Sequence, residues 1–384
     1  MSGKKSRVCG EPSAKHSQMC STSGLSPVLG VQGAGAGAEG PAPEELGGEA
    51  PVVTLAGIRD AAARLGPYVH RTPVLANTYL NETSGREVFF KCELFQKTGS
   101  FKARGACNAV LLTPPECRDV VTHSSGNHAQ ALAWAAGAKG IKAHVVMPNN
   151  SSAVKVAAAR GYGASVTFCE NSKTGRETTA AAVVSEHPLS ALVLSSDDYR
   201  VQCGQGTVGL ELVEQVKELT GGADLDAIIV PIGGGGLISG VATAVKSLCP
   251  AIHVIGVEPQ KAPAAFRSKK SGSLQGHDAL PDTIADGLRT TLARTAWPVV
   301  RDSVDEIVTV SEEDIRRWMR VVYERMKLVI EPSAAVGVAA LMSPHVRGLS
   351  ADLKRVGVIL CGGNVDLTEL QDQLLAGGGV QSPP

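Results

Sequence analysis

The stretch AIIVPIGGGGLISGVATAVKSL, residues 227–248, joins a strand, a glycine loop and a helix in immediate succession. Residues 227–231 are continuously apolar, which is typical of a parallel strand buried on both faces. Gly233 to Gly236 follow this strand, and residues 237–248 are predicted to form a helix. A loop without side chains lets its N–H groups close on an anion at the helix N-terminus. The stretch therefore predicts phosphate binding within an α/β fold.

Two other uses of this glycine loop stay open from these residues alone, a simple tight turn and a dinucleotide site. Glu258 favours the dinucleotide site, because it ends the next strand, where an acid would bind a ribose. The G-x-G-x-x-G register argues against it, because the third glycine position holds Ile238 or Ser239. No Walker lysine follows the loop either.

The alternation of short apolar strands with helices continues on both sides of this stretch. It predicts parallel sheets covered on both faces, with ligands bound where strand carboxyl ends meet helix N-termini. The predicted strands are 87–93, 119–123, 143–147, 164–169, 191–194, 227–231, 253–257 and 356–360. The predicted helices are 55–65, 101–112, 126–137, 154–160, 176–187, 206–219 and 237–248.

Composition limits the classes of function. The 384 residues carry 37 basic and 37 acidic side chains, so a binder of nucleic-acid backbones is not expected. No apolar stretch is as long as a membrane span, and no membrane partner is expected. The nine cysteines form no C-x-x-C pair, which together with the lack of a secretory signal predicts a cytoplasmic protein. Residues 1–50 are rich in Gly, Ala and Pro and are predicted to be a disordered tail.

Lys102, at the end of the run Gly99-Ser100-Phe101-Lys102, is the second candidate for a chemical role. Ser100 is a plausible N-cap, so that Lys102 would lie in the first turn of a helix. A lysine is by default a solvated surface charge, but a desolvated lysine amine is nucleophilic and forms Schiff bases. Lys102 and the glycine loop together point to pyridoxal phosphate, which carries an aldehyde and a phosphate.

Two further strand ends carry polar groups. In the run from Thr122 to His128, the Asn127 amide could bind a ring hydroxyl, and the preceding N–H groups could hold a carboxylate. The same residue types are also favoured as N-caps for structural reasons. Cys361 ends a strand before Gly362; its thiol could face a ring nitrogen, or it is a buried structural cysteine.

Five blocks in the same order, 90–102, 122–128, 233–236, 326–334 and 361–367, resemble the fold-type II family of pyridoxal-phosphate enzymes. This family includes serine racemases and the serine and threonine dehydratases, and the resemblance covers roughly residues 53 to 370. It implies two open, doubly wound parallel-sheet domains with the active site between them. It also implies a homodimer. The implied large cofactor-binding domain consists of residues 51–117 and 197–375. The implied small domain consists of residues 118–196, and residues 376–384 form a C-terminal tail.

The resemblance also implies roles for individual residues. Lys102 would form the Schiff base, and Ser125 would act on the opposite face of the substrate. The implied cofactor contacts are Phe101 beside the ring, Asn127 at the 3-hydroxyl, Cys361 at the pyridine nitrogen, and Gly233, Gly234, Gly235, Gly236 and Leu237 at the phosphate. The implied substrate contacts are Ser124, Ser125, Gly126, Asn127 and His128.

The implied activity is interconversion of L-serine and D-serine with a side reaction, β-elimination of serine to pyruvate and ammonia. Racemisation requires two proton-transfer groups on opposite faces of the α-carbon. The resemblance leaves two alternatives open within the family, a serine/threonine dehydratase and an aspartate racemase. Cys361 favours elimination, because serine racemases usually carry serine there, while the loop 149–153 and Arg160 leave serine and aspartate both open. A non-catalytic nucleotide-binding or regulatory homologue is the alternative from another class.

The family's effector sites are only partly preserved. A site for Mg²⁺ or Ca²⁺ would use Glu258 and the Ala262 carbonyl, but the third ligand position holds Ala264. The implied site for ATP as an effector consists of Asn77, Thr78, Tyr79, Lys97, Thr98 and Gln130.

Overall fold

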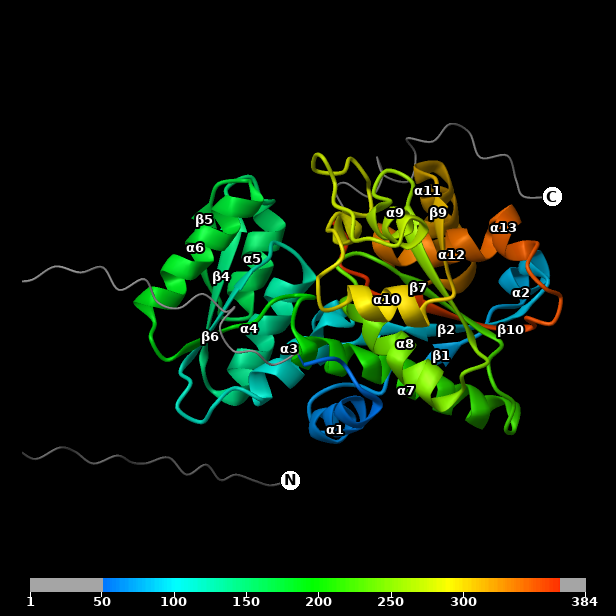
Figure 1. The fold of residues 1–384 in the computed structure, drawn as a ribbon, viewed down its shortest axis with the longest axis horizontal. Helices are drawn as coiled ribbons and strands as arrows, with labels where there is room; N and C mark the ends of the chain where they lie inside the picture. Colours follow the sequence, from blue (N-terminus) through cyan, green and yellow to red (C-terminus); the bar gives the residue numbers. More distant parts are fainter. Residues whose placement is uncertain (1–50, 367–384) are drawn as a thin grey trace, which may run out of the picture. The chain divides into compact units, whose positions relative to one another are not determined.

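The structure is a computed structural model that describes residues 51–366. The predicted tails 1–50 and 376–384, and the end of the large domain at 367–375, lie outside the described residues. The described chain forms two sheets, one of six strands and one of four (Figure 1). The domain boundaries expected from the sequence stay a prediction.

The six-stranded sheet has the order β1-β2-β10-β7-β8-β9, and only β1 runs antiparallel to its neighbour. The central strands are almost wholly buried because helices cover both faces. The bounds are Val74–Leu75 for β1, Glu87–Cys92 for β2, Ala227–Pro231 for β7, His253–Pro259 for β8, Glu306–Val310 for β9 and Arg355–Leu360 for β10.

The four-stranded sheet has the order β5-β4-β3-β6 and is parallel throughout. Helices α4, α5 and α6 surround it in Figure 1. The strands are β3 (Asp119–His123), β4 (Lys142–Pro148), β5 (Ser165–Cys169) and β6 (Ser190–Leu192). The helices are α4 (Asn127–Lys139), α5 (Ala153–Gly161) and α6 (Lys173–Glu186).

Close packing shows which helices cover the two faces of the six-stranded sheet. A Cβ on Gly357 of β10 would meet Leu212 of α7 at 2.9 Å. The next residue, Val358, lies on the opposite face, where a Cβ on Gly337 of α12 would meet its side chain at 3.2 Å. All eleven residues of α12 are buried, as expected for a helix that is apolar all round. The remaining helices are α1 (Leu55–Leu65), α2 (Thr78–Ser84), α3 (Lys102–Leu111), α7 (Tyr199–Thr220), α8 (Gly236–Leu248), α9 (Ala264–Ser271), α10 (Trp297–Ser303), α11 (Glu312–Val321), α12 (Pro332–Met342) and α13 (Pro344–Arg347).

The α/β class and the predicted strands are confirmed, with end shifts of one or two residues. The predicted cap at Ser100 is wrong, because α3 begins at Lys102 and its N-cap is Phe101. Ser100 is extended and bridges to Gly362, so the end of β10 holds its backbone away from the helix. The helix predicted from 206 begins at Tyr199, where Asp198 caps it. The sequence analysis did not predict β1, β9, α2 or α9 to α13.

A buried ion network ties α3 to β2 and α7. Arg104 is fully buried and donates from Nε and Nη2 to both oxygens of Glu93, at 2.8 Å each. The same guanidinium donates to both oxygens of Glu211 at 2.7 and 2.8 Å. Lys91 reaches Glu211 at 2.6 Å, so two cations balance two carboxylates. The network fixes the helix that carries Lys102.

One ion pair links a helix of the four-stranded sheet to the rest of the chain. Lys155 of α5 pairs with Asp286 of the short 3-10 helix Asp286–Leu288, which packs on α12. Both side chains are 39% exposed. No helix within residues 51–366 is both long and apolar enough to cross a membrane.

Candidate active site

The connection from β2 into α3 is fixed against the end of β10. The Phe101 N–H donates to the Cys361 carbonyl at 3.0 Å, and the Gly363 N–H donates to the Gly99 carbonyl at 2.9 Å. These bonds flank the bridge between Ser100 and Gly362. They place Lys102 where the carboxyl ends of two parallel strands meet, as expected for a ligand site in an α/β sheet.

The Lys102 amine is desolvated. Its Nζ donates to the Ser195 carbonyl at 3.0 Å and lies 5.1 Å from the centre of the Phe101 ring. Burial lowers the pKa of Lys102 to about 8, against the opposing effects of Cys361 and Glu331. Part of the population is therefore a neutral, nucleophilic amine near pH 8.

The glycine loop lies beside the segment that Lys102 contacts. A Cβ on Gly234 would stand 2.3 Å from Ser196 Oγ, and one on Gly236 would stand 3.2 Å from Ser196 Cα. Gly235 has a φ of +83°, which disfavours other residues. The 13-residue helix α8 begins at Gly236, so its free N–H groups lie at this loop. The structure thus brings the lysine and the glycine loop together through Ser195 and Ser196, two residues that the sequence analysis missed.

Asn127 opens α4 and is held by two other elements. Its Nδ2 donates to both oxygens of Glu331, at 3.0 and 2.9 Å. Its Oδ1 accepts from Asn364 at 2.9 Å, and Asn364 in turn donates to the Thr98 carbonyl. Glu331 and Asn364 were also missed as site residues, although both lie in or beside sequence blocks that the resemblance rests on. The network orients the Asn127 amide.

Two buried acidic groups in this network have raised pKa values, which favours their protonated, uncharged forms. Burial, helped by the Asp286 charge, raises the pKa of Glu331 to about 7. Burial, helped by Glu331, raises the pKa of the Cys361 thiol well above its usual value. The Cys361 Sγ lies 3.9 Å from Glu331 Oε1. Cys361 is therefore a neutral thiol at physiological pH.

The run 124–128 forms a bend that enters α4. The Ser124 N–H donates to the Val146 carbonyl, which ties the bend to the neighbouring strand. Ser125 is partly exposed at this bend. His128 is only 2% exposed and contacts the Val193 carbonyl through Nε2. Burial, with the Lys102 charge, lowers the pKa of His128 to about 3, so this imidazole is neutral.

The profile of the pyridoxal-phosphate-dependent enzymes matches residues 65–362. The chain belongs to this family. Serine racemase of Dictyostelium discoideum is 45% identical over 321 residues, which cover 83% of this chain and 97% of that one. The solved structure of maize serine racemase has 42% identity and a TM-score of 0.79, covering 85% and 98% of the two chains. A solved pyridoxal-phosphate-dependent aspartate racemase has 39% identity and a TM-score of 0.77, covering 83% and 98%.

The residues of this family member fit pyridoxal phosphate. A desolvated lysine amine suits an aldehyde, and the N-terminus of α8 behind a glycine loop suits a phosphate. Substituting Gly233 would bring a Cβ to 2.9 Å from the Gly287 carbonyl, so the loop has no room for side chains. The neutral Cys361 thiol suits an uncharged ring nitrogen.

The predicted cation site does not fit Mg²⁺ or Ca²⁺. Both carboxylate oxygens of Glu258 accept N–H bonds at the start of α9, from Ala265 at 2.9 Å and Phe266 at 2.8 Å. Burial raises the pKa of Glu258 to about 7, and Ala264 offers no side-chain oxygen. Hard cations of this type need several oxygen ligands.

We expect Mg²⁺ and Ca²⁺ to leave the thermal midpoint of the holoenzyme unchanged. Ala264→Asp would add a carboxylate near Glu258 and should make the midpoint rise with Mg²⁺. Differential scanning fluorimetry of both proteins at several Mg²⁺ concentrations measures this. A rise in the unaltered protein would show that Glu258 and the Ala262 carbonyl bind the ion without the third ligand.

The predicted ATP residues fall into two groups. Asn77 caps α2 and donates to the Arg325 carbonyl, while the Arg325 guanidinium lies 4.8 Å from the Tyr79 ring centre. Thr98 has a φ of 59° in the 3-10 helix Lys97–Gly99, which packs on α4, the helix that carries Gln130. The ATP site stays a prediction.

Proposed function

We propose that this enzyme interconverts L-serine and D-serine and, as a side reaction, converts serine to pyruvate and ammonia. The observation that carries the proposal is the desolvated amine of Lys102, aimed at the segment that packs on the glycine loop. The relatives named as serine racemases, 45% identical in the case of Dictyostelium discoideum, support serine as the substrate.

Lys102 is proposed to anchor the cofactor and to move the α-proton on one face of the substrate. Its Nζ has a pKa of about 8, close to the pH at which a base must both accept and release a proton. Pyridoxal phosphate, when bound, withdraws electron density from the substrate α-carbon, which makes the α-proton removable. The stacked Phe101 ring limits where the lysine side chain can lie.

Ser125 is proposed to carry the proton on the opposite face. The bend at 124–126 places it at the start of α4, beside the oriented Asn127. A hydroxyl there can donate a proton through Oγ while Lys102 accepts one on the other side. The N–H groups from Ser125 to His128, at the start of a 13-residue helix, suit the substrate carboxylate, whereas the Ser124 N–H is already bonded to the Val146 carbonyl.

The other cofactor contacts follow from the same arrangement. Gly233 to Gly236 and Leu237 are proposed to hold the phosphate, and Asn127 to bind the 3-hydroxyl. Neutral Cys361 is proposed to face the pyridine nitrogen and to leave it uncharged. With its ring nitrogen uncharged, the cofactor would withdraw less electron density, and the neutral Cys361 thiol therefore supports loss of the β-hydroxyl of serine as the side reaction.

The position of Arg160 supports serine over aspartate. Its side chain lines an open surface depression together with Asn149, Ser151, Val156 and Phe168. Neither Lys102 nor the glycine loop lines this depression. A cation at a second substrate carboxylate would favour aspartate, and Arg160 lies in this other depression.

Chiral chromatography of the holoenzyme incubated separately with L-serine, L-aspartate and L-threonine tests the proposal. The expected products are D-serine and pyruvate from L-serine. D-aspartate as the main product would make the enzyme an aspartate racemase. Keto acids from L-serine and L-threonine without any D-amino acid would make it a dehydratase.

Ser125→Ala should remove racemisation and keep part of the elimination from L-serine. The expected loss of racemisation is about 10²- to 10⁴-fold, because one general acid disappears while Lys102 remains. Production of D-serine and of pyruvate is measured on the same sample, so each reaction serves as a control for the other. Equal losses of both reactions would contradict the opposite-face role.

The cytoplasmic location stays a prediction from the cysteine pattern, and the homodimer and regulation by ATP stay predictions from the resemblance. The division into a small domain at 118–196 and a large domain around it is proposed on the same basis. The separate four-stranded sheet, formed by strands between Asp119 and Leu192, supports this division.

A further inference from the structure

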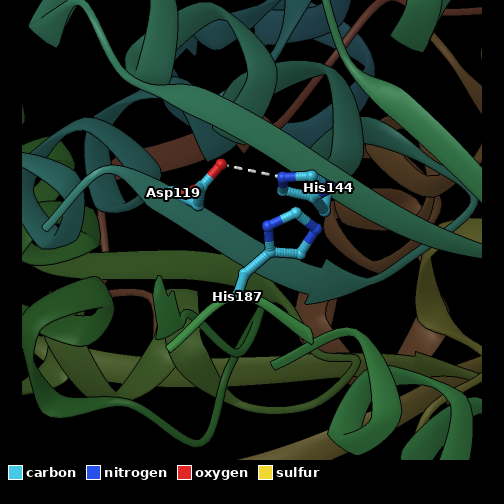
Figure 2. A group of neighbouring side chains, drawn as sticks. All are labelled: Asp119, His144 and His187. Atoms are coloured by element: carbon cyan, nitrogen blue, oxygen red, sulfur yellow. Dashed lines mark hydrogen bonds and ion pairs between the residues drawn. The ribbon is translucent and has the colours of Figure 1, made fainter. Parts of the chain in front are cut away.

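Three potential metal ligands from distant parts of the sequence converge on the four-stranded sheet. They are Asp119 at the start of β3, His144 in β4 and His187 directly after α6. One ligand atom from each lies within 4.8 Å of the others. Figure 2 shows the His187 ring beside His144, which is bonded to Asp119.

Strand register explains why these side chains meet. Asp119 and Val121 lie on one face of β3, because side chains alternate along a strand. His144 is the register partner of Val121, so it lies on that same face. Helix α6 covers this face through Val183, which packs with Val121, and its chain then turns at His187. The end of α6 thus places His187 beside Asp119 and His144.

The surroundings favour a cation. Asp119 and His144 have side chains only 14% and 11% exposed, and His144 Nε2 lies 2.9 Å from Asp119 Oδ1. Within residues 51–366, Asp119 forms an ion pair with His144 alone; Lys142 shares the face by register but forms none with it. The C-terminus of the 14-residue helix α6 adds partial negative charge at His187.

The hydroxyl of Ser190, on the same face of the sheet, has no hydrogen-bond partner within the described part of the chain. Ser190 of β6 is the register partner of Asp119 and therefore lies on the same face. Its Oγ is inaccessible to solvent and makes no hydrogen bond. A buried hydroxyl without a partner is costly unless a ligand or a bound water satisfies it.

We propose that Asp119, His144 and His187 bind a divalent transition-metal ion, with zinc as the preferred ion. Two imidazoles and one carboxylate are a common ligand set for zinc, with water in the fourth position. Ligand atoms at about 2.1 Å from a tetrahedral ion lie about 3.4 Å apart. The ligand atoms lie within 4.8 Å of one another, so even the widest separation would have to close by no more than about 1.4 Å.

The site is separate from the proposed chemistry at Lys102. Asp119 is the first residue of β3, whereas the bend with Ser125 follows the carboxyl end of the same strand. The ion would therefore fasten the end of α6 to β3 and β4 and take no part in proton transfer. It would act as a structural link within the four-stranded sheet.

The test measures zinc binding by the full-length holoenzyme after treatment with a chelator. Titration against a chromophoric zinc chelator should show one ion per chain. His187→Asn should weaken binding at least about 100-fold, because even the loss of a residue that only orients a ligand costs 10- to 100-fold. The absorbance of the bound cofactor should not change, which separates this site from the Lys102 site.

His345→Asn is the matched control. His345 is a 58% exposed histidine that bonds to a carboxylate, Glu306 Oε2 at 2.8 Å, outside the proposed site. This variant should keep full zinc affinity, and its loss of affinity would assign the ion to Glu306. Cobalt bound in place of zinc should show d–d bands without a thiolate charge-transfer band, whereas a thiolate band would assign the ion to a cysteine.

Asp119→Asn provides a second variant if His187→Asn disturbs the helix end, which circular dichroism reveals. This variant should weaken binding as His187→Asn does. Unchanged zinc affinity in a folded variant of either residue would overturn the proposal. Binding of the unaltered holoenzyme no tighter than millimolar would also overturn it.

Discussion

Lys102→Ala is expected to abolish both racemisation and elimination, by at least about 10⁴-fold. The substitution removes the amine that the structure places at Ser195, with its lowered pKa of about 8. The violet absorbance that the cofactor gives when joined to the protein should disappear as well. Product formation from L-serine and an absorbance spectrum of the purified protein measure both effects.

Lys173→Ala is a suitable control for this experiment. Lys173 begins α6, its side chain is 86% exposed, and its partner Glu177 lies 3.9 Å away. This variant should keep the activity and the colour. Borohydride reduction followed by peptide mapping should find the cofactor on Lys102 in both the unaltered protein and the control. A coloured, active Lys102→Ala protein would place the cofactor on another lysine.

Arg104→Leu is expected to lower the free energy of unfolding by about 3–5 kcal/mol. Arg104 and Glu93 are both fully buried, so the substitution leaves the Glu93 carboxylate without its main partner. Burial alone would raise the pKa of Glu93, but the Arg104 charge keeps it below its usual value. Urea denaturation of the two holoenzymes measures the difference.

The pH dependence of this effect has a definite sign. A carboxylate whose pKa is lowered on folding stabilises the protein above its unfolded pKa of about 4.3, and this contribution is lost as the pH falls through the folded value. The difference between Arg104→Leu and the unaltered protein should therefore be largest near pH 7 and shrink below about pH 4. Glu93→Gln in the Arg104→Leu background should recover part of the stability, because it removes the unpaired charge.

Arg71→Ala is the matched control for this ion pair. Arg71 and Glu218 form a pair of the same chemistry at 2.7 Å, but their side chains are 48% and 61% exposed. Its removal should cost less than about 1 kcal/mol. A similar loss in both variants would mean that burial does not determine the effect.

The parallel strands were predictable because their signal is local. Continuous apolar runs such as 227–231 bounded by glycine or charged residues specify buried strands without knowledge of their neighbours. β9, by contrast, lies at the edge of its sheet and mixes Glu306 and Thr309 with apolar residues. α12 has no polar face because it is buried all round, so it shows no helical periodicity.

Lys102, Asn127 and the glycine loop stood out as candidates because each combines a distinctive chemistry with a junction between a strand and a helix. The structure brings the lysine and the loop to the same segment, and the roles of these residues stay predictions. Glu331 could not be assigned from the residues, because its partner Asn127 lies 204 positions away in the chain. Its raised pKa depends on burial, which only the packed structure reveals.

The ion pair between Lys155 and Asp286 couples a surface contact to the ionisation of a buried group. The Asp286 charge raises the pKa of Glu331, and the Lys155 charge lowers it. With both partners 39% exposed, the attraction is worth about 0–1 kcal/mol and is screened by salt. Whenever Lys155 swings into solvent, the proton affinity of Glu331 rises. By reciprocity, protonation of Glu331 near pH 7 should weaken the attraction that holds the Lys155 side chain of α5 at this position.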